Sequence, residues 1–167
     1  DSGQNAKISY SIRNGTQWIF GIDKDSGEIY TTGRLDREER QSYVLEVVAV
    51  DEGVEDTRMA RTEVRIIIDD ENDNQPQLDE YPFMAKILPQ HPPDTEILRV
   101  SARDADSGRN SDLKFSLLHE DVDRFKIDPG TGIISASSSL ELEDGEMFHL
   151  EVLVRDEGSP ALTSTGL

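Results

Sequence analysis

Residues 69–76 read Asp-Asp-Glu-Asn-Asp-Asn-Gln-Pro, a run of acids and amides closed by a proline. Carboxylate and amide oxygens at this density suit a hard cation such as Ca²⁺, which takes about six to eight oxygen ligands. Taken alone, the run is more typical of a solvated acidic linker than of a metal site. The choice between a metal site and a linker therefore depends on the elements that position these side chains.

The run directly follows residues 64–68, Val-Arg-Ile-Ile-Ile, a β-branched stretch that predicts a strand. Residues 43–50 and 148–155 also predict strands, the second with Leu150, Val152 and Val154 on one face. Tight turns are expected at residues 25–28 and 129–132, and a hairpin turn at residues 13–16. Residues 34–39 could form one short turn, and no stretch shows a sustained helical period. Short strands with frequent turns indicate an all-β sandwich or barrel.

The chain contains the same pattern twice, at an offset of 105 residues between Asp1-Ser2-Gly3 and Asp106-Ser107-Gly108. The same offset matches Asp51-Glu52-Gly53 to Asp156-Glu157-Gly158. A period near 100 residues is too long for a solenoid unit and suits tandem domains. We expect one domain at residues 1–75, cropped of its N-terminal strands, and one at 76–167, cropped of its C-terminal strand.

Composition narrows the possible functions. The chain has 17 basic and 35 acidic side chains, a net charge of −18, which argues against nucleic acid or an anionic membrane as a partner. It has no cysteine, so an extracellular domain would need another stabilising element, for which bound metal is suited. No signal peptide and no apolar run of membrane-spanning length is present in the 167 residues.

Four motifs in this order resemble those of the cadherin repeat. They are Leu35-Asp36-Arg37-Glu38, Ala49-Val50-Asp51-Glu52-Gly53, Asp70-Glu71-Asn72-Asp73-Asn74-Gln75-Pro76 and Asp104-Ala105-Asp106-Ser107-Gly108-Arg109-Asn110. The resemblance covers nearly all of the chain. It implies tandem Greek-key β-sandwiches of cadherin-like, immunoglobulin-like topology, in the extracellular part of a plasma-membrane protein. It also implies calcium-dependent cell–cell adhesion or recognition, with other cadherin-family ectodomains as homophilic or heterophilic partners.

Position by position, the resemblance implies a set of Ca²⁺ ligands at the junction of the two repeats, with about three ions. The expected ligands are Asp36, Glu38, Asp70, Glu71 (carbonyl), Asn72, Asp73, Asn74 (carbonyl), Asp104, Asp106, Asn110 (carbonyl) and Asp156. Seven of them contribute carboxylates, whose charge of −7 nearly balances three dications. Without the ions, charges about 5 Å apart repel by about 3 kcal/mol per pair at an effective dielectric near 20.

Another kind of calcium site and the enzymatic interpretations do not fit the residues. An EF-hand loop needs Gly at its sixth and Glu at its twelfth position, but counting from Asp104 the Gly is fifth and the twelfth residue is Phe115. The Asp-Ser-Gly triplets lack the apolar flanks of an aspartic protease, and no hydrolase, zinc or phosphate-loop motif occurs. We expect no enzyme, no small-molecule substrate, and membrane attachment only through the parent chain's anchor. The alternative function is a Ca²⁺-stabilised spacer or stalk without direct partner contact.

Three further expectations concern particular residues. Asn14-Gly15-Thr16 is a glycosylation sequon within a predicted turn. If Leu45 and Val47 face the core, Val44, Val48 and Val50 form an apolar outer face that Ile67 could extend. The second repeat has Glu141 where the first has Asp36, and Pro89 or Gln90 at the position of a family glutamate. This difference predicts weaker calcium binding at a junction following residue 167.

Overall fold

The computed structural model describes residues 7–13, 18–51, 53, 58–80, 82–88, 90–118, 123–143 and 146–166. It divides the chain into two compact units, Asp1–Asp69 and Asp70–Leu167. The boundary that we expect from the sequence lies after residue 75. The division falls earlier because Asn72 and Asn74 hydrogen-bond to residues of the second unit, so the acidic run belongs with that unit.

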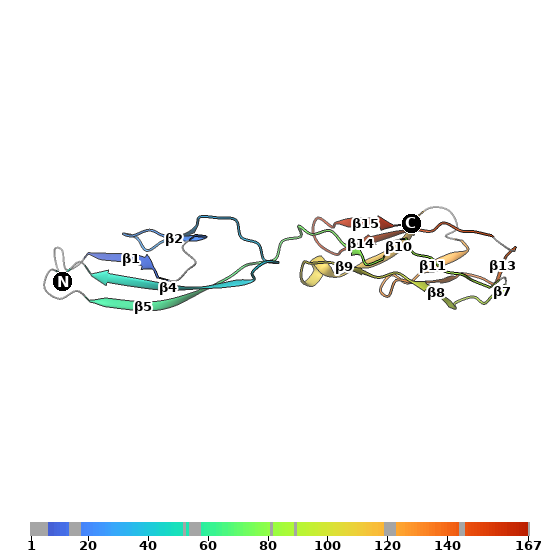
Figure 1. Cartoon of the computed structure of the whole chain (residues 1–167), viewed down its shortest axis with the longest axis horizontal. Coiled ribbons are helices and arrows are strands. Elements are labelled where there is room, and N and C mark those ends of the chain that lie inside the picture. Colours follow the sequence, from blue (N-terminus) through green and yellow to red (C-terminus); the bar gives the residue numbers. More distant parts are fainter. Residues whose placement is uncertain are drawn as a thin grey trace. The chain divides into compact units, whose positions relative to one another are not determined.

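The described residues of the first unit form five strands. They are β1 (Ile8–Ile12), β2 (Phe20–Ile22), β3 (Ile29–Thr31), β4 (Ser42–Asp51) and β5 (Met59–Ile67). The order β1-β4-β5 forms one antiparallel sheet, and β2 pairs with β3 in a second, smaller one (Figure 1). The strands predicted at residues 43–50 and 64–68 are thus confirmed as parts of β4 and β5, and β5 begins five residues earlier than expected.

The core of the first unit follows the alternation along β4. Tyr43, Leu45 and Val47 are buried, and the register sets Leu45 opposite the half-buried Val64 of β5. The ring of Tyr43 meets that of Phe20 edge-on, with centroids 5.1 Å apart, which joins the two sheets. The alternating pattern therefore forms the core because every second residue of a strand faces the same side.

One expectation about this sheet is wrong. The alternation places Val48 on the outer face, yet its side chain is fully buried. It lies in the central strand, with Ser11 of β1 and Arg61 of β5 as its cross-strand neighbours. A central strand is covered from both sides, whereas Val44 on the same face remains 43% exposed near the end of the strand. The expected outer patch therefore lacks its middle residue.

In the second unit, the residues that the structure describes form ten strands and one 3₁₀ turn. These are β6 (Gln77–Leu78), β7 (Gln90–His91), β8 (Glu96–Arg99), β9 (Ala102–Arg103), η2 (Gly108–Ser111), β10 (Lys114–Leu118), β11 (Phe125–Ile127), β12 (Ile133–Ala136), β13 (Leu140–Glu141), β14 (Glu151–Arg155) and β15 (Thr163–Gly166). The sheets have the orders β10-β14-β15 and β11-β12-β8, and two pairs, β13-β7 and β6-β9, complete them (Figure 1).

The sequence predicts that the second unit is cropped of its C-terminal strand, and the four-residue strand β15 lies at this end. Strand β15 pairs antiparallel with β14 over four residues, in the place that β5 takes beside β4 in the first unit. The two-residue spacing of Leu150, Val152 and Val154 did predict the inward face of this region correctly. However, the strand itself begins only at Glu151.

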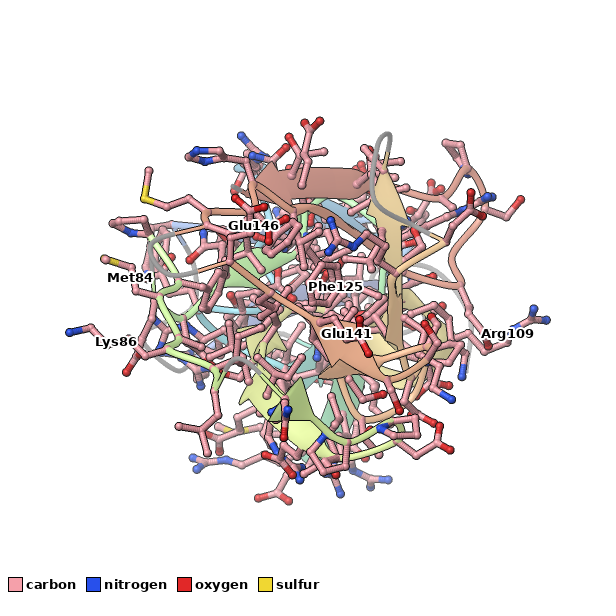
Figure 2. All side chains as sticks on the ribbon, turned by 90° about the vertical axis from the view of Figure 1, so that its right-hand side faces the viewer. Met84, Lys86, Arg109, Phe125, Glu141 and Glu146 are labelled. Atoms are coloured by element: carbon pink, nitrogen blue, oxygen red, sulfur yellow. The ribbon has the colours of Figure 1, made fainter. Side chains whose placement is uncertain are left out.

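Two hydrophobic clusters stabilise the second unit, one around Val100, Phe115 and Val154 and the other around Phe125 and Leu140. In Figure 2, Phe125 lies in the middle of the view, while the side chains of Met84, Lys86 and Arg109 project at the rim. Phe125 is 3% exposed, and its ring meets Phe148 edge-on with centroids 5.0 Å apart. This pair repeats the aromatic contact of the first unit at the matching positions of the sequence.

The two predicted tight turns are confirmed and are built alike. Asp128 accepts hydrogen bonds from the backbone N–H groups of Gly130 and Thr131, and Gly132 follows with a φ of 68°. Asp23 accepts in the same way from the turn before Gly27, whose φ is 76°. Glycine is required at both positions because a positive φ is costly for a residue with a Cβ. The hairpin predicted at residues 13–16 lies largely outside the described residues.

The fold as a whole confirms the all-β prediction. In the part of the chain that the structure covers, η2 is the helical element, and the remaining regular structure is strand. Among these residues, no helix is long and apolar enough to cross a membrane. Residues 37–39 form a turn, as expected from the sequence.

Candidate metal centre of the second unit

The acids of the second unit gather where two of its strands end. Asp104 and Asp106 follow β9, and Asp156 follows β14. Asp106 is 7% and Asp156 only 1% exposed, although both carry carboxylates. A buried carboxylate is costly unless it is hydrogen-bonded or binds a cation. This end of the unit must therefore supply hydrogen-bond donors or a cation to these two carboxylates.

Asn72 of the acidic run lies against Asp156. Its Nδ2 donates to both carboxylate oxygens of Asp156, at 3.3 and 3.2 Å, and to the carbonyl of Pro160 at 2.7 Å. Because all three neighbours are acceptors, the amide nitrogen must face them and the amide oxygen must face away. Asp156 itself accepts from the backbone N–H groups of Gly158 and Leu162 at 2.8 and 2.9 Å.

Gly158 makes this approach possible. A Cβ at position 158 would lie 2.3 Å from the Asn72 Nδ2 and 2.8 Å from the Asn110 Oδ1, closer than any real side chain permits. The glycine therefore leaves room for two residues that belong to the predicted ligand set. The sequence contained a signal for it, since Gly53 and Gly158 occupy matching positions in the two copies.

Asn74 binds the second buried acid. Its backbone N–H donates to the Asp106 Oδ2 at 3.2 Å, and its Nδ2 donates to the Asp106 Oδ1 at 2.7 Å. The same Nδ2 also donates to Asp73 at 2.9 Å, so Asn74 holds one exposed and one buried carboxylate. The backbone N–H of Asp106 in turn donates to the Asp104 Oδ1 at 3.0 Å.

Asp70 connects the start of the run to the loop that contains η2. Its carboxylate accepts from the Ser107 N–H, with both oxygens at 3.2 Å, and from the Asn110 Nδ2 at 2.8 Å. One oxygen of Asp70 and one of Asp106 lie within 4.8 Å of each other. Seven of the predicted ligands, Asp70, Asn72, Asp73, Asn74, Asp106, Asn110 and Asp156, are thus joined pairwise by these hydrogen bonds, and Asp104 is joined to Asp106.

Two buried oxygen atoms of this group accept no hydrogen bond, the Asn72 Oδ1 and the Asp104 Oδ2. Burial raises the pKa of the Asp104 carboxyl above its ordinary value of 3.8. The hydrogen bond from the Asp106 amide opposes this rise, and the charges of Asp106 and Asp156 add to it. Buried acceptors without a donor are rare in folded proteins. Unpaired oxygens of a carboxylate and an amide among further carboxylates are the donor set that Ca²⁺ prefers, so the residues fit this ion.

The remaining predicted ligands are Asp36 and Glu38 of the first unit and Glu71 of the acidic run. Asp36 and Glu38 belong to the first unit, where the Asp36 Oδ1 accepts from the Glu39 N–H at 3.0 Å. Glu71 is exposed within the acidic run of the second unit. Sequence reasoning missed Ser107, Gly158 and Pro160, whose backbone groups or missing side chain shape the site. A motif of side-chain oxygens carries no sign of such contributions.

The second unit thus defines a β-sandwich domain with an acidic, oxygen-rich cluster at one end, preceded in the chain by a second domain of the same kind. A model of the cadherin domain matches residues 1–69 and 85–167 of this sequence. The chain therefore belongs to the cadherin family, as the motifs predicted. The predicted fold class is likewise confirmed.

Known proteins agree with this assignment. The chain is 44% identical over 170 residues to protein dachsous of Drosophila melanogaster, covering all of this chain and 5% of that protein. It is 39% identical over 166 residues to mouse protocadherin Fat 4, covering 99% of this chain and 3% of that protein. Among solved structures, mouse cadherin-23 EC22-24 is similar with a TM-score of 0.88 and 31% identity, covering 99% of this chain and 52% of that one.

A second solved structure, the extracellular domain of protocadherin γB4, has a TM-score of 0.86 and 28% identity, covering 99% of this chain and 29% of that one. The chain spans a few per cent of the length of the curated relatives it matches. These relatives are cadherins and protocadherins of the adhesion type and not enzymes, and the solved relatives are extracellular domains.

The predicted weakness of a following junction stays a prediction. Glu141 lies in strand β13, where it pairs with Gln90 of β7, and Pro89 lies outside the described residues. In Figure 2 the side chain of Glu141 lies near the centre of the view, with Glu146 above it. Glu141 therefore sits in a strand, whereas Asp36 begins a turn in the first unit.

Proposed function

We propose that this chain is a calcium-stabilised pair of ectodomain repeats that serves calcium-dependent cell–cell adhesion or recognition. The observation that carries the proposal is the pair of buried, unpaired oxygens, Asn72 Oδ1 and Asp104 Oδ2, among the carboxylates of Asp106 and Asp156. Ca²⁺ would supply the positive charge that these oxygens lack. Asn72, Asp104, Asp106 and Asp156 would hold one ion within the second unit.

We also infer that Asp36 and Glu38 of the first repeat complete the ligand set together with Asp70, Glu71, Asp73, Asn74 and Asn110. The support is the motif match and the near balance of seven carboxylates against about three dications. If ligands of both repeats hold the ions, the two repeats would keep a fixed angle only when calcium is bound. Without it, the acids of the junction would repel one another, because the chain offers far more acidic than basic side chains.

The partners we propose are other cadherin-family ectodomains, bound homophilically or heterophilically. The chain would meet them outside the cell, as part of the ectodomain of a plasma-membrane protein. Beads coated with the chain should aggregate in about 1 mM Ca²⁺ and disperse when the ion is chelated. If they stay dispersed, beads coated with a relative's ectodomain provide the heterophilic test. Calorimetry that detects no Ca²⁺ binding to the chain would refute the calcium part of the proposal, whatever the beads do.

A second function, a calcium-stabilised spacer without partner contact, is favoured by one observation. The outer face of the β1-β4-β5 sheet lacks the continuous apolar patch expected from the sequence, because Val48 is buried. Its exposed apolar residues stand apart, Val44 and Ile67 towards one end of the sheet and Met59 towards the other. Calcium-dependent melting without aggregation, with either the chain or its relatives as partner, would select the spacer function.

A further inference from the structure

The turn that contains Asp36 and Glu38 holds a close ion pair of its own. The Nη2 of Arg37 lies 2.6 Å from the Oε1 of Glu38. The Arg37 side chain is only 11% exposed and that of Glu38 is 26% exposed, so water screens this pair less than an ordinary surface pair. The guanidinium therefore holds one oxygen of a carboxylate that belongs to the proposed ligand set.

Arg40, the residue directly after this turn, makes different contacts. Arg40 donates from Nε to the carbonyl of Ser42 at 3.1 Å, and its guanidinium lies 4.4 Å from the centre of the Tyr43 ring. Arg40 thus packs on Tyr43 of the aromatic pair and contacts residues of β4. Two arginines three residues apart carry the same charge, but Arg37 is the one that contacts the Glu38 carboxylate.

The second repeat has no arginine at the position of Arg37. At the offset of 105 residues, Leu142 replaces Arg37 and Glu143 replaces Glu38. Leu142 packs against the cluster of Phe125 and Leu140 instead of reaching its neighbour's carboxylate. Within the described part of the chain, Glu143 makes no ion pair, and its backbone N–H donates to the Glu146 Oε2 at 3.1 Å. The chain itself therefore shows that this fold tolerates an apolar side chain at the position of Arg37.

We propose that Arg37 is a built-in counter-ion that positions Glu38 and sets the calcium affinity of the junction, an inference that rests on the proposed function above. Its guanidinium takes the Glu38 Oε1, which leaves Oε2 as the oxygen for an ion. In the calcium-free protein, the same positive charge neutralises one acid of the set. Arg37 thus stabilises the calcium-free state and weakens calcium binding.

The size of the effect follows from the charges. A dication on the carboxylate that Arg37 contacts would lie roughly 6 Å from the guanidinium, given oxygen–calcium distances of about 2.4 Å. Even at the dielectric of water, a unit charge and a dication at that separation repel enough to change an affinity about tenfold. Loss of positioning of Glu38 offsets part of this gain. We expect a three- to tenfold tighter midpoint when the charge is removed.

The test compares Arg37→Leu, the residue that the second repeat uses, with Arg37→Lys and Arg40→Leu in the whole chain. Calorimetric titration with CaCl₂ measures affinity, and melting in chelator, followed through the fluorescence of Trp18 in the first unit, measures stability. Arg37→Leu should melt earlier in chelator and bind calcium about three- to tenfold tighter. Arg37→Lys keeps the charge and should stay within about twofold of the wild type.

Arg40→Leu is the matched control, because it removes the same charge and lowers the melting temperature without touching Glu38. Its calcium midpoint should stay within about twofold of the wild type. If Arg37→Leu fails to fold, Arg37→Gln gives the same comparison. Equal or weaker calcium binding by the uncharged variants would overturn the role of Arg37. A wild-type chain that binds no calcium would instead overturn the proposed function, so the two failures are distinguishable.

Discussion

Replacing Asn72 by Asp changes the amide that faces Asp156 into a second carboxylate. In the wild type, the Asn72 Nδ2 lies 3.3 and 3.2 Å from the two oxygens of Asp156, which is only 1% exposed. The substitution removes charge-assisted hydrogen bonds that contribute about 1.5–3 kcal/mol. It also places two negative charges side by side in a site with little solvent.

The repulsion in the calcium-free protein follows from the same distance. Two unit charges 3.3 Å apart repel by about 5 kcal/mol at an effective dielectric near 20, and by about 3 kcal/mol after the side chains separate to about 5 Å. Together with the lost hydrogen bonds, Asn72→Asp should cost the second unit about 4–6 kcal/mol in chelator. Asn72→Ala removes the hydrogen bonds without adding a charge and should cost about 2 kcal/mol.

Calcium should reverse the order of the two variants. Asp offers an oxygen where the Asn72 Oδ1 stands unpaired, and Ala offers none. Hydrogen exchange of peptides from β14 reports the stability of the second unit, and peptides from β4 in the first unit serve as an internal control. In chelator, β14 should exchange faster in Asn72→Asp than in Asn72→Ala, and in about 5 mM Ca²⁺ it should exchange more slowly.

An unchanged order of the two variants in calcium would show that the Asn72 oxygen faces no ion. Faster exchange of Asn72→Ala than of Asn72→Asp in chelator would show that repulsion between residues 72 and 156 does not dominate the calcium-free site. Either result can be obtained from one experiment, because the two variants share every other contact of the site.

Three further predictions concern the rest of the chain. Chelation of calcium should lower the melting temperature, since a site at a Ca²⁺ concentration of about twenty times its dissociation constant adds about 1.8 kcal/mol to the stability. Among single changes at the junction, Asp73→Ala should reduce this calcium dependence most, as calorimetry with and without the ion would show. Hydrogen bonds from the Thr131 side chain and from backbone N–H groups hold the pKa of Asp128 below its ordinary value of 3.8. Its contribution to stability is present above that value and is lost as the pH falls through the lower folded pKa, so Asp128→Asn should destabilise the chain at neutral pH and progressively less below pH 4 in denaturant titrations. Val48→Lys should lower the free energy of unfolding by about 3 kcal/mol or more, because its site is fully buried. Val44→Lys, at 43% exposure, should change it by no more than about 0.5 kcal/mol and can be tested for lost aggregation of the folded protein. Equal melting temperatures of the two variants would contradict the burial of Val48.

Features that depend on short-range spacing could be predicted from the sequence. The alternation along residues 43–50 gave the inward face of β4, because successive residues of a strand point to opposite sides. The turns around Gly27 and Gly132 followed from glycine's access to positive φ. The repeat at an offset of 105 residues predicts two domains of one kind; the structure divides the chain after Asp69, and the cadherin-domain model matches residues 1–69 and 85–167.

Other features required the tertiary structure, because they join residues that are far apart in the chain. Asn72 and Asp156 are 84 residues apart, so no local pattern shows which amide atom faces which acid. The space that Gly158 leaves for Asn72 exists only after both have been placed. Val48 follows the same alternation as Val44, yet its cover depends on the strands at its two sides. The sequence alone determined which residues alternate, turn and carry charge, whereas packing between distant segments decided which of them are buried and which oxygens are left without a donor.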